Sequence, residues 1–505
     1  MEETHSRQKI ETMEIEGGSI TEVQHITSGE FIFPDGKCIN GLPRFYRVAV
    51  KLMPTSSSDI NAEIWLPENN WNGRLLGTGN GGGAGGIIYW ALANGIQQGY
   101  ATANTDLGTS PNANCVVGIP ERWADFGYRA THVMTAAAKK IIEVYYNRPA
   151  RYAYFRGDST GGQQALMEAQ RYPKDYNGII AGVPANNRTL LHTAFLWNLK
   201  ALNQEPESAL LPEQIALLTK AMVAKRTEKD GGAREDNFFS DPRSCDIELD
   251  SLLKDIPLKE HQIAALKKIY SGPVNPRTGE QIYTPIPYGS ENSPSGLLYQ
   301  QDPDRCPDTL LYLFRWVFGN NFDWKQFDFD RDLDVLQQRL APILNANNPD
   351  LGELKKAGGK ILMYSGAADP LVPYQDALNY YERVIEAQHG LEPTQEFFRY
   401  FLVPGRCHGE EGSPGFSSIS SGIEGESLLS AMVSWVEEGK APDRLMATAY
   451  QDGSPSKEIT AVRPVYPYPK FAEYAGGDPS LTSSYKAVEH PRGKVIKPAD
   501  RYLRS

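Results

Sequence analysis

The sequence lacks several features that mark large functional classes. It contains no run of about 18 apolar residues, which excludes a membrane-spanning helix. Its 51 Lys and Arg residues are outnumbered by 62 Asp and Glu residues, and the net charge of −11 argues against nucleic-acid binding. The first residues have neither the basic start nor the apolar stretch of a secretory signal. We therefore expect a cytoplasmic protein with no membrane or nucleic-acid partner.

Cysteine is scarce, and its distribution argues against two further classes. No two cysteines form a CxxC pair, so a zinc site built from thiolates is not expected. Their number is odd and their spacing is wide, which makes a disulfide framework improbable. The five cysteines are Cys38, Cys115, Cys245, Cys306 and Cys407.

The chain does have the length and composition of a large globular enzyme. Its 505 residues are enough for about three domains, or for one large core with an insertion. In the first part of the chain, apolar and β-branched runs alternate with a segment of helical periodicity, and this order is typical of a parallel sheet. The pattern predicts strands over 46–52, 62–66, 74–77, 152–155 and 178–182, and helices over 128–146 and 162–172.

The composition of the chain and its pattern of predicted elements change near residue 191 and again near residue 352. Between these points, amphipathic helical pieces are separated by loops rich in Pro, Gly and Asn; afterwards the strand–helix rhythm returns. We expect one core made of residues 1–190 and 352–505, with residues 191–351 inserted as a lid and an extended tail after about residue 460. The predicted strands are 360–365 and 396–403, and the predicted helices are 211–223, 260–270, 376–387 and 427–438.

The most specific motif is Gly157-Asp158-Ser159-Thr160-Gly161, which lies between a predicted strand and a predicted helix. This is the context of a nucleophile elbow, a sharp turn that holds a serine hydroxyl above the edge of a sheet and requires small flanking residues. The helix start behind the serine offers amide groups that favour negative charge. An ordinary glycine-rich turn with a capping serine would have a similar sequence, but the flanking strand and helix favour Ser159 as a nucleophile.

A serine nucleophile needs a base, and in this fold class an acid and then a histidine follow it along the chain. Asp369 lies in the loop after the predicted strand over 360–365. His408 lies in the loop after the next strand, and of the eight histidines only this one has both the order and the location. Taken singly, each would suit an ordinary turn or loop. Together they predict a triad in which His408 takes the Ser159 proton and Asp369 orients the imidazole.

A triad also needs two N–H donors for the oxyanion. One expected donor is the backbone amide of Thr160, the residue after the nucleophile. The second is expected from the glycine-rich segment 79–86, with Gly82 as the candidate, because a backbone without side chains can approach a ligand closely. A phosphate-binding loop is the alternative, but the segment lacks the Gly-Lys-Ser/Thr ending that such a loop requires.

With these motifs the chain resembles the tannase and feruloyl esterase family of serine hydrolases, over about residues 43–480. The resemblance implies an α/β class fold, namely an α/β-hydrolase core with a mostly parallel sheet and a large lid. It implies hydrolysis of esters of phenolic or other aromatic acids, and it carries the triad onto Ser159, Asp369 and His408. The segments that carry it include Asn72–Gly86, Phe126–Ala130, Met167–Pro173, Ile180–Asn187, Asn275–Gly279, Phe327–Asp332, Ala368–Pro373 and Pro467–Pro469.

Two departures from the family pattern bear on the site. The family places cysteines just before the nucleophile and just after the histidine and joins them by a disulfide, whereas this chain has Asp158 and Gly409 there. We hypothesise that hydrogen bonding by Asp158 helps to hold the nucleophile instead. The family lid often binds calcium, but here Thr227 stands at the first ligand position and the acidic spacing is expanded. We therefore expect a solvated acidic loop, with no metal and no cofactor.

These observations predict a serine esterase, a carboxylic ester hydrolase that cleaves an aromatic or related small-molecule ester through an acyl-enzyme. Two alternatives stay open: an acyltransferase or lactone-processing enzyme of secondary metabolism on the same scaffold, and a non-catalytic binding protein. The sequence does not determine the oligomeric state. Six lid aromatics are expected to form lid core rather than an aryl pocket. These are Tyr312, Phe314, Trp316, Phe318, Phe322 and Trp324.

Overall fold

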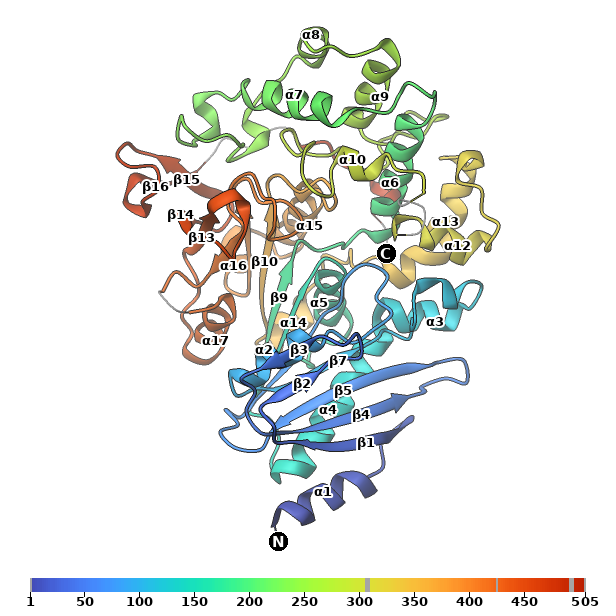
Figure 1. Cartoon of the computed structure of the whole chain (residues 1–505), viewed down its shortest axis with the longest axis vertical. Coiled ribbons are helices and arrows are strands. Elements are labelled where there is room, and N and C mark those ends of the chain that lie inside the picture. Colours follow the sequence, from blue (N-terminus) through green and yellow to red (C-terminus); the bar gives the residue numbers. More distant parts are fainter. Residues whose placement is uncertain (1, 305–308, 424–425, 490–494, 504–505) are drawn as a thin grey trace.

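A computed structural model describes residues 2–304, 309–423, 426–489 and 495–503. Its central feature within these residues is a nine-stranded sheet in the order β1-β4-β5-β7-β6-β8-β9-β10-β11 (Figure 1). Neighbouring strands are antiparallel from β1 to β7 and parallel from β7 to β11. The strands are β1 (Gly18–Ile26), β4 (Phe45–Leu52), β5 (Ile60–Pro67), β6 (Arg74–Thr78), β7 (Ala101–Thr105), β8 (Tyr152–Asp158), β9 (Gly178–Gly182), β10 (Lys360–Gly366) and β11 (Phe398–Val403).

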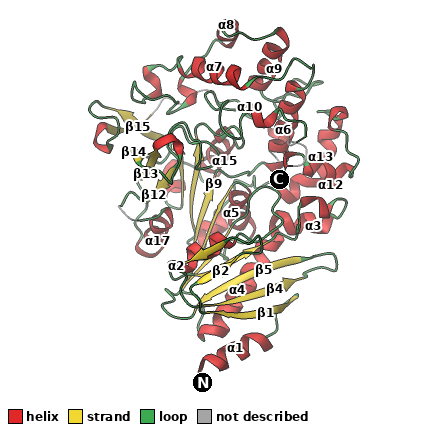
Figure 2. Ribbon diagram, viewed as in Figure 1, coloured by secondary structure: helices red, strands yellow, loops and turns green. Residues whose placement is uncertain are grey.

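Helices cover both faces of the sheet (Figure 2), as the α/β prediction requires. Side chains alternate between the two faces along a strand. In β10, for example, Ile361 and Met363 belong to one apolar cluster, and Leu362 and Tyr364 belong to the opposite one. The first cluster includes residues of α4 (Ala130–Tyr146), α5 (Thr160–Arg171) and α15 (Tyr374–Ala387), and the second includes residues of α17 (Leu428–Glu438).

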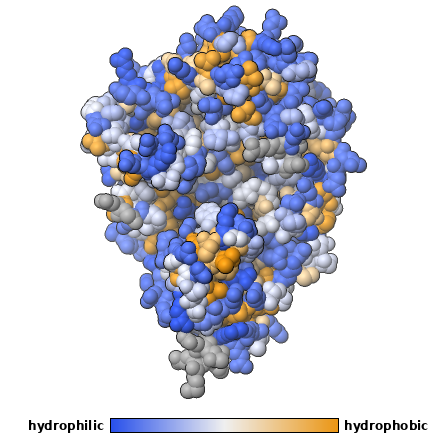
Figure 3. Space-filling view, in the orientation of Figure 1, coloured by the Kyte–Doolittle hydropathy of each residue, from blue (hydrophilic) through white to orange (hydrophobic). Residues whose placement is uncertain are grey.

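Residues 191–351, the predicted lid, consist of helices separated by long loops. In Figure 1, α7 to α10 lie beyond the carboxyl ends of β9 and β10, whereas α12 and α13 lie at the side of the core. The end of α6 and the helices α7 to α10 form an apolar cluster of their own, whereas most of α6, together with α12 and α13, contributes to the main cluster of the core. Figure 3 shows apolar side chains scattered among polar ones over this part of the surface. The helices are α6 (Arg188–Leu202), α7 (Pro212–Val223), α8 (Leu249–Lys254), α9 (Glu260–Ser271), α10 (Leu297–Gln300), α12 (Tyr312–Phe318) and α13 (Arg331–Leu344).

The lid aromatics divide into two groups. Tyr312, Phe314 and Trp316 of α12 are buried in the main cluster, in agreement with the expected core role. Phe318, Phe322 and Trp324 are only partly buried against it. Along the described residues, no helix has both the length and the apolar character needed to cross a membrane.

The sequence analysis missed several strands. The segment after residue 460 was predicted to be an extended tail, but much of it pairs into strands. β14 (Ile459–Val465) joins a three-stranded sheet, and β15 (Lys470–Tyr474) pairs with β16 (Tyr485–Glu489). β7, with the sequence Ala-Thr-Ala-Asn-Thr, is completely buried although it lacks the large apolar side chains that usually indicate a strand.

Candidate active site

The turn between β8 and α5 holds Ser159 in a strained backbone conformation, with φ 63° and ψ −115°. A non-glycine residue with positive φ is costly and persists only where its surroundings impose it. The Ser159 amide donates to the Gly182 carbonyl at 2.9 Å, which ties the turn to β9. A Cβ added at Gly157 would lie 2.4 Å from the carbonyl oxygen of Gly161, so the small flanking residues are a steric requirement. The geometry is that of a nucleophile elbow.

The structure brings Ser159, His408 and Asp369 into one hydrogen-bonded chain. His408 Nε2 lies 3.1 Å from Ser159 Oγ, and His408 Nδ1 lies 2.9 Å from Asp369 Oδ2. An ionised carboxylate only accepts hydrogen bonds, so Nδ1 carries the proton toward Asp369 and Nε2 is left to accept from the serine hydroxyl. The Asp369 side chain is completely buried, and that of His408 is 18% exposed.

Backbone contacts hold the acid and the histidine in place. The second carboxylate oxygen of Asp369 accepts from the amides of Leu371 and Val372, each at 2.9 Å. The Ala368 amide donates to the Arg406 carbonyl at 2.9 Å, which joins the acid loop to the histidine loop. Because β8, β9, β10 and β11 run parallel, their carboxyl ends lie at one edge of the sheet, and the three loops converge there.

The two residues expected to form the oxyanion hole also lie together. Thr160 begins α5, and its amide has no hydrogen-bond partner within the described part of the chain. The Thr160 hydroxyl donates to the Gly82 carbonyl at 2.6 Å. Sequence reasoning missed Arg188, a buried residue whose guanidinium donates to the Gly82 carbonyl at 2.7 Å and to the Thr160 hydroxyl at 3.0 Å. No sequence motif indicates this arginine, which joins the start of α6 to the glycine-rich segment and to the first residue of α5.

Asp158 takes part in a contact behind the nucleophile. Its carboxylate accepts from the hydroxyl of Tyr364, a buried residue of β10. A Cβ at Gly182 would lie only 1.7 Å from Asp158 Oδ1, so the glycine leaves the room for this contact. Asp158 therefore joins the end of β8 to β10, the strand that precedes Asp369. Whether this bond supports turnover stays a prediction.

The cysteines form no disulfide within the described residues. Cys38, Cys115, Cys245 and Cys407 are all free thiols, and Cys306 lies outside those residues. Cys407, which precedes His408, is buried, and burial raises the pKa of its thiol. This keeps it in the neutral form, which is a poor nucleophile and a poor metal ligand.

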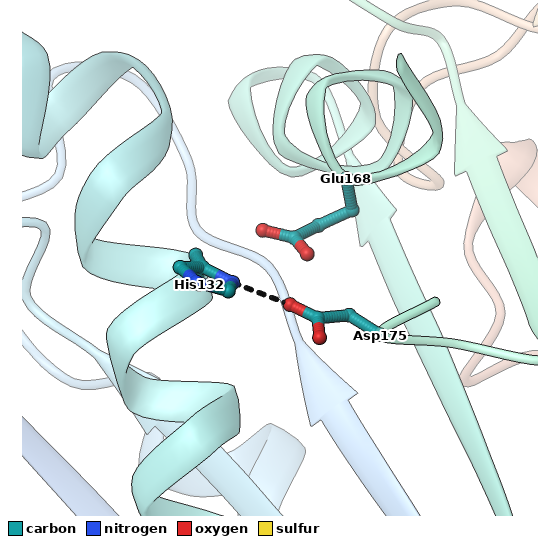
Figure 4. Close-up of side chains that lie close together, drawn as sticks. All are labelled: His132, Glu168 and Asp175. Carbon is teal, nitrogen blue, oxygen red and sulfur yellow. Dashed lines mark hydrogen bonds and ion pairs between the residues drawn. The ribbon is translucent and has the colours of Figure 1, made fainter. Parts of the chain in front are cut away.

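One group of side chains has the donor atoms of a metal site. Ligand atoms of His132, Glu168 and Asp175 lie within 4.8 Å of one another on α4, α5 and the loop after α5 (Figure 4). His132 Nδ1 is 2.6 Å from Asp175 Oδ2, and the ammonium of Lys139 is 3.4 Å from the other oxygen. Burial and the neighbouring Asp175 charge raise the pKa of Glu168 well above its usual value. Among the described residues neither oxygen of the buried Glu168 carboxyl has a hydrogen-bond partner, and the neutral form is the less costly one to bury, so we assign the group no cation.

The Asp230 and Asp236 carboxylates in the acidic segment of the lid, where the family often binds calcium, both have partners within the protein. The Asp230 carboxylate accepts from the amides of Ser240 and Asp241 at 2.9 Å. The Asp236 carboxylate pairs with the guanidinium of Arg463 at 2.9 and 3.0 Å. One oxygen each of Asp230 and Asp236 gathers with the Ser240 hydroxyl around Gly232. Arg226 and Arg463 already supply positive charge to these carboxylates, so we assign no cation to the group. That the protein needs no metal or cofactor stays a prediction.

The sheet topology, the elbow and the converging loops define an α/β-hydrolase. Comparison with known proteins then narrows the class. The family model described as tannase and feruloyl esterase matches residues 47–305 and 312–488. The chain belongs to this family, as its sequence motifs predicted, and it is a carboxylic ester hydrolase of the tannase and feruloyl esterase type.

Individual relatives agree with this assignment. An uncharacterized esterase of Xanthomonas campestris pv. campestris is 32% identical, over 95% of this chain and 91% of that protein. A probable feruloyl esterase of Arthroderma benhamiae is 30% identical, over 84% of this chain and 82% of that protein. The crystal structure of feruloyl esterase B from Aspergillus oryzae superimposes with a TM-score of 0.84 at 25% identity, covering 96% of this chain and all of the other (100%).

Proposed function

We propose that this protein hydrolyses esters of aromatic, phenolic-acid-like carboxylic acids through an acyl-enzyme on Ser159. The observation that carries the proposal is the continuous chain of contacts from Ser159 Oγ to His408 at 3.1 Å and on to Asp369 at 2.9 Å. Each of these side chains lies at the carboxyl edge of the sheet, in the chain order expected of this fold class. The names of the related esterases support an aromatic acid as the acyl group.

The reaction follows from the roles of these groups. His408 Nε2 accepts the serine proton while Ser159 Oγ attacks the ester carbonyl, and the buried Asp369 stabilises the imidazolium that forms. The amide of Thr160 faces the developing oxyanion together with an amide of the segment around Gly82. The imidazolium then gives its proton to the leaving alcohol, and water repeats the sequence on the acyl-enzyme with His408 as the base.

A panel of esters tests the proposal. Methyl esters of aromatic acids, such as methyl ferulate and methyl gallate, are compared with methyl esters of aliphatic acids, and we expect kcat/KM to favour the aromatic acids. Ser159→Ala is the control, and loss of the nucleophile should lower kcat by about 10⁴–10⁶-fold. A fluorophosphonate should add one label to Ser159 in the native protein and none in the variant. Equal kcat/KM values for the methyl esters of aliphatic acids would reject the aromatic class. An active Ser159→Ala variant would reject the acyl-enzyme.

A further inference from the structure

The lid contains a cavity that the proposed reaction does not use. It has a volume of about 520 Å³ and is lined by residues of α6, α9, the short helix η5 (Trp324–Gln326) and the segment after it. The lining includes neither Ser159 nor His408. The first residue of α6, Arg188, contacts Thr160 beside the nucleophile, and Trp197 lies about 14 Å further along the same helix at about 1.5 Å per residue. The cavity is therefore a separate site on the lid.

Aromatic rings form the walls of this cavity. Trp197 and Trp324 are both half-buried, and Phe329 packs edge-on against Trp197 with ring centroids 5.1 Å apart. The indole N–H of Trp197 donates to the Lys268 carbonyl at 2.9 Å, so the polar edge of this ring is already satisfied by the protein. What the indole offers to the cavity is its apolar surface, which suits a flat apolar or aromatic ligand.

Three lysines surround the same cavity, namely Lys200, Lys268 and Lys325. The Lys200 ammonium donates to the carbonyls of Lys325 and Phe327, each at 3.0 Å, and an ammonium has three hydrogens, so one remains for a ligand. Lys325 is exposed, with its ammonium 5.5 Å from the ring centroid of Trp324. Positive charge is thus placed directly beside an aromatic wall.

The remaining lining groups do not neutralise this charge. Among the described residues that line the cavity, none is an aspartate or a glutamate. Burial lowers the pKa of Lys200, and the nearby Asp328, Asp323 and Asp332, which lie outside the lining, partly offset this by favouring the charged ammonium. The amide oxygen of Gln204 accepts from Lys268 and is occupied. Asn203 donates through its amide nitrogen to two main-chain carbonyls, so its amide oxygen is the acceptor that it offers to the cavity. Cationic donors still outnumber such acceptors, which favours an anionic ligand over a neutral sugar with its many hydroxyl donors.

We propose that this cavity is a binding site for an aromatic carboxylate, with the ring against Trp197 and Trp324 and the carboxylate beside Lys200 and Lys325. Its volume lies within the range of about 300–1,000 Å³ that is typical of small-molecule sites. The binding does not require the proposed reaction. The ligand, however, belongs to the chemical class of the acid that this reaction releases, so the lid would hold the product acid at a second position.

The test is a calorimetric titration of the full chain with sodium cinnamate, after Ser159 has been blocked with a fluorophosphonate. Mass spectrometry first measures the blocking, so a failed label reports on the proposed function and the titration reports on the lid. We expect saturable binding with one site per chain. Trp324→Ala should weaken it by about tenfold or more, because the aromatic face against which the cinnamate ring packs is lost. Trp90→Ala is the matched control, since Trp90 lies on α2 (Tyr89–Gln97) and is 60% exposed.

Charge is tested separately, with a variant that cannot disturb the core. Lys325→Gln should weaken cinnamate binding several-fold and reduce its dependence on salt, whereas Lys140→Gln on the exposed face of α4 should not. Methyl cinnamate, which has the ring without the charge, should bind more weakly than cinnamate. The proposal is overturned if the blocked enzyme does not bind cinnamate, if methyl cinnamate binds equally well, if both lid variants bind like the native protein, or if a neutral xylo-oligosaccharide is preferred.

Discussion

The carboxyl edge of the sheet and the lid are held together by different kinds of contact. At the edge, main-chain groups do most of the positioning, as in the bonds from the Ser159 amide to Gly182 and from the Ala368 amide to Arg406. In the lid, individual side chains connect loops that no sheet orders. The Arg226 guanidinium, for example, donates to the carbonyls of Asp236 and Phe238, both at 2.8 Å.

Because of this difference, we expect the edge of the sheet and the lid to respond differently to substitutions. Main-chain geometry is common to any sequence that forms the sheet, so the edge depends on a few positions where a side chain must be small or must carry the chemistry. The lid depends on many polar side chains, each worth about 1 kcal/mol. We expect changes at the edge to abolish activity and changes in the lid to alter stability and ligand preference.

The largest effect is expected at the edge, from Asp369→Asn. The amide retains the size of the carboxylate, but it does not hold the imidazole in the tautomer that accepts the serine proton. We expect kcat to fall by about 10⁴-fold with little change in KM. Steady-state kinetics on methyl ferulate measure kcat and KM, and the melting temperature of the variant shows whether it is folded. A fall of less than tenfold would show that the acid does not orient His408.

A second prediction concerns the small residues of the elbow. Gly157→Ala places a Cβ 2.4 Å from the Gly161 carbonyl oxygen, so the turn must open, and we expect a loss of about 2–4 kcal/mol in the free energy of unfolding together with most of the activity. Gly86→Ala is the matched control for stability alone, because its Cβ meets no atom within 4 Å. Urea unfolding of both variants compares them. Equal stability would contradict the main-chain account of the edge.

The smallest effect is expected in the lid and depends on pH. Burial raises the pKa of Asp230 to about 6, above the value of about 3.9 for an unfolded chain. The folded state therefore binds the proton more tightly, and the free energy of unfolding should rise as pH falls from about 7 to about 4. Asp230→Asn should flatten this rise by about 2 kcal/mol and leave kcat at neutral pH nearly unchanged.

The measurement is urea unfolding of the native protein and of Asp230→Asn at several pH values between 4 and 7. Asp376, whose pKa is also raised by burial to about 6, is present in both proteins, so the difference between the curves isolates Asp230. Parallel curves would show that the lid carboxylate does not titrate in this window. A large loss of activity would contradict the separation between the lid and the edge.

Sequence patterns predicted most of the sheet but missed the edge strand β1 and the internal strand β7. Strands such as those over 178–182 and 360–365 are continuous apolar runs, because a parallel strand is buried on both faces, and they were placed to within a residue or two. β7 was missed because its Ala, Thr and Asn side chains are buried by small size and by hydrogen bonds rather than by apolar bulk. Asn104, for instance, donates to the Thr78 carbonyl at 2.7 Å.

The candidate site shows the same division. Ser159, Asp369 and His408 were found because the elbow motif and the order of the loops are local signals. Arg188 was missed because its role consists entirely of contacts with Gly82 and Thr160, which are distant in the chain. The partner of Asp158 was equally hidden, since Tyr364 reads as one more apolar position of a strand until the sheet places it two strands away.

By itself, the sequence determined the class of the fold, the family and the identity of the three candidate catalytic residues. It could do so because hydrophobic periodicity, turn residues and the order of motifs are signals that can be recognised along the chain. Only the tertiary structure decided that the three side chains meet at distances of 3.1 and 2.9 Å, that an arginine at the start of α6 holds the glycine-rich segment, and that the lid contains an aromatic cavity surrounded by lysines. Those features join segments separated by tens to hundreds of residues, and their spacing is set by the packing of the whole chain.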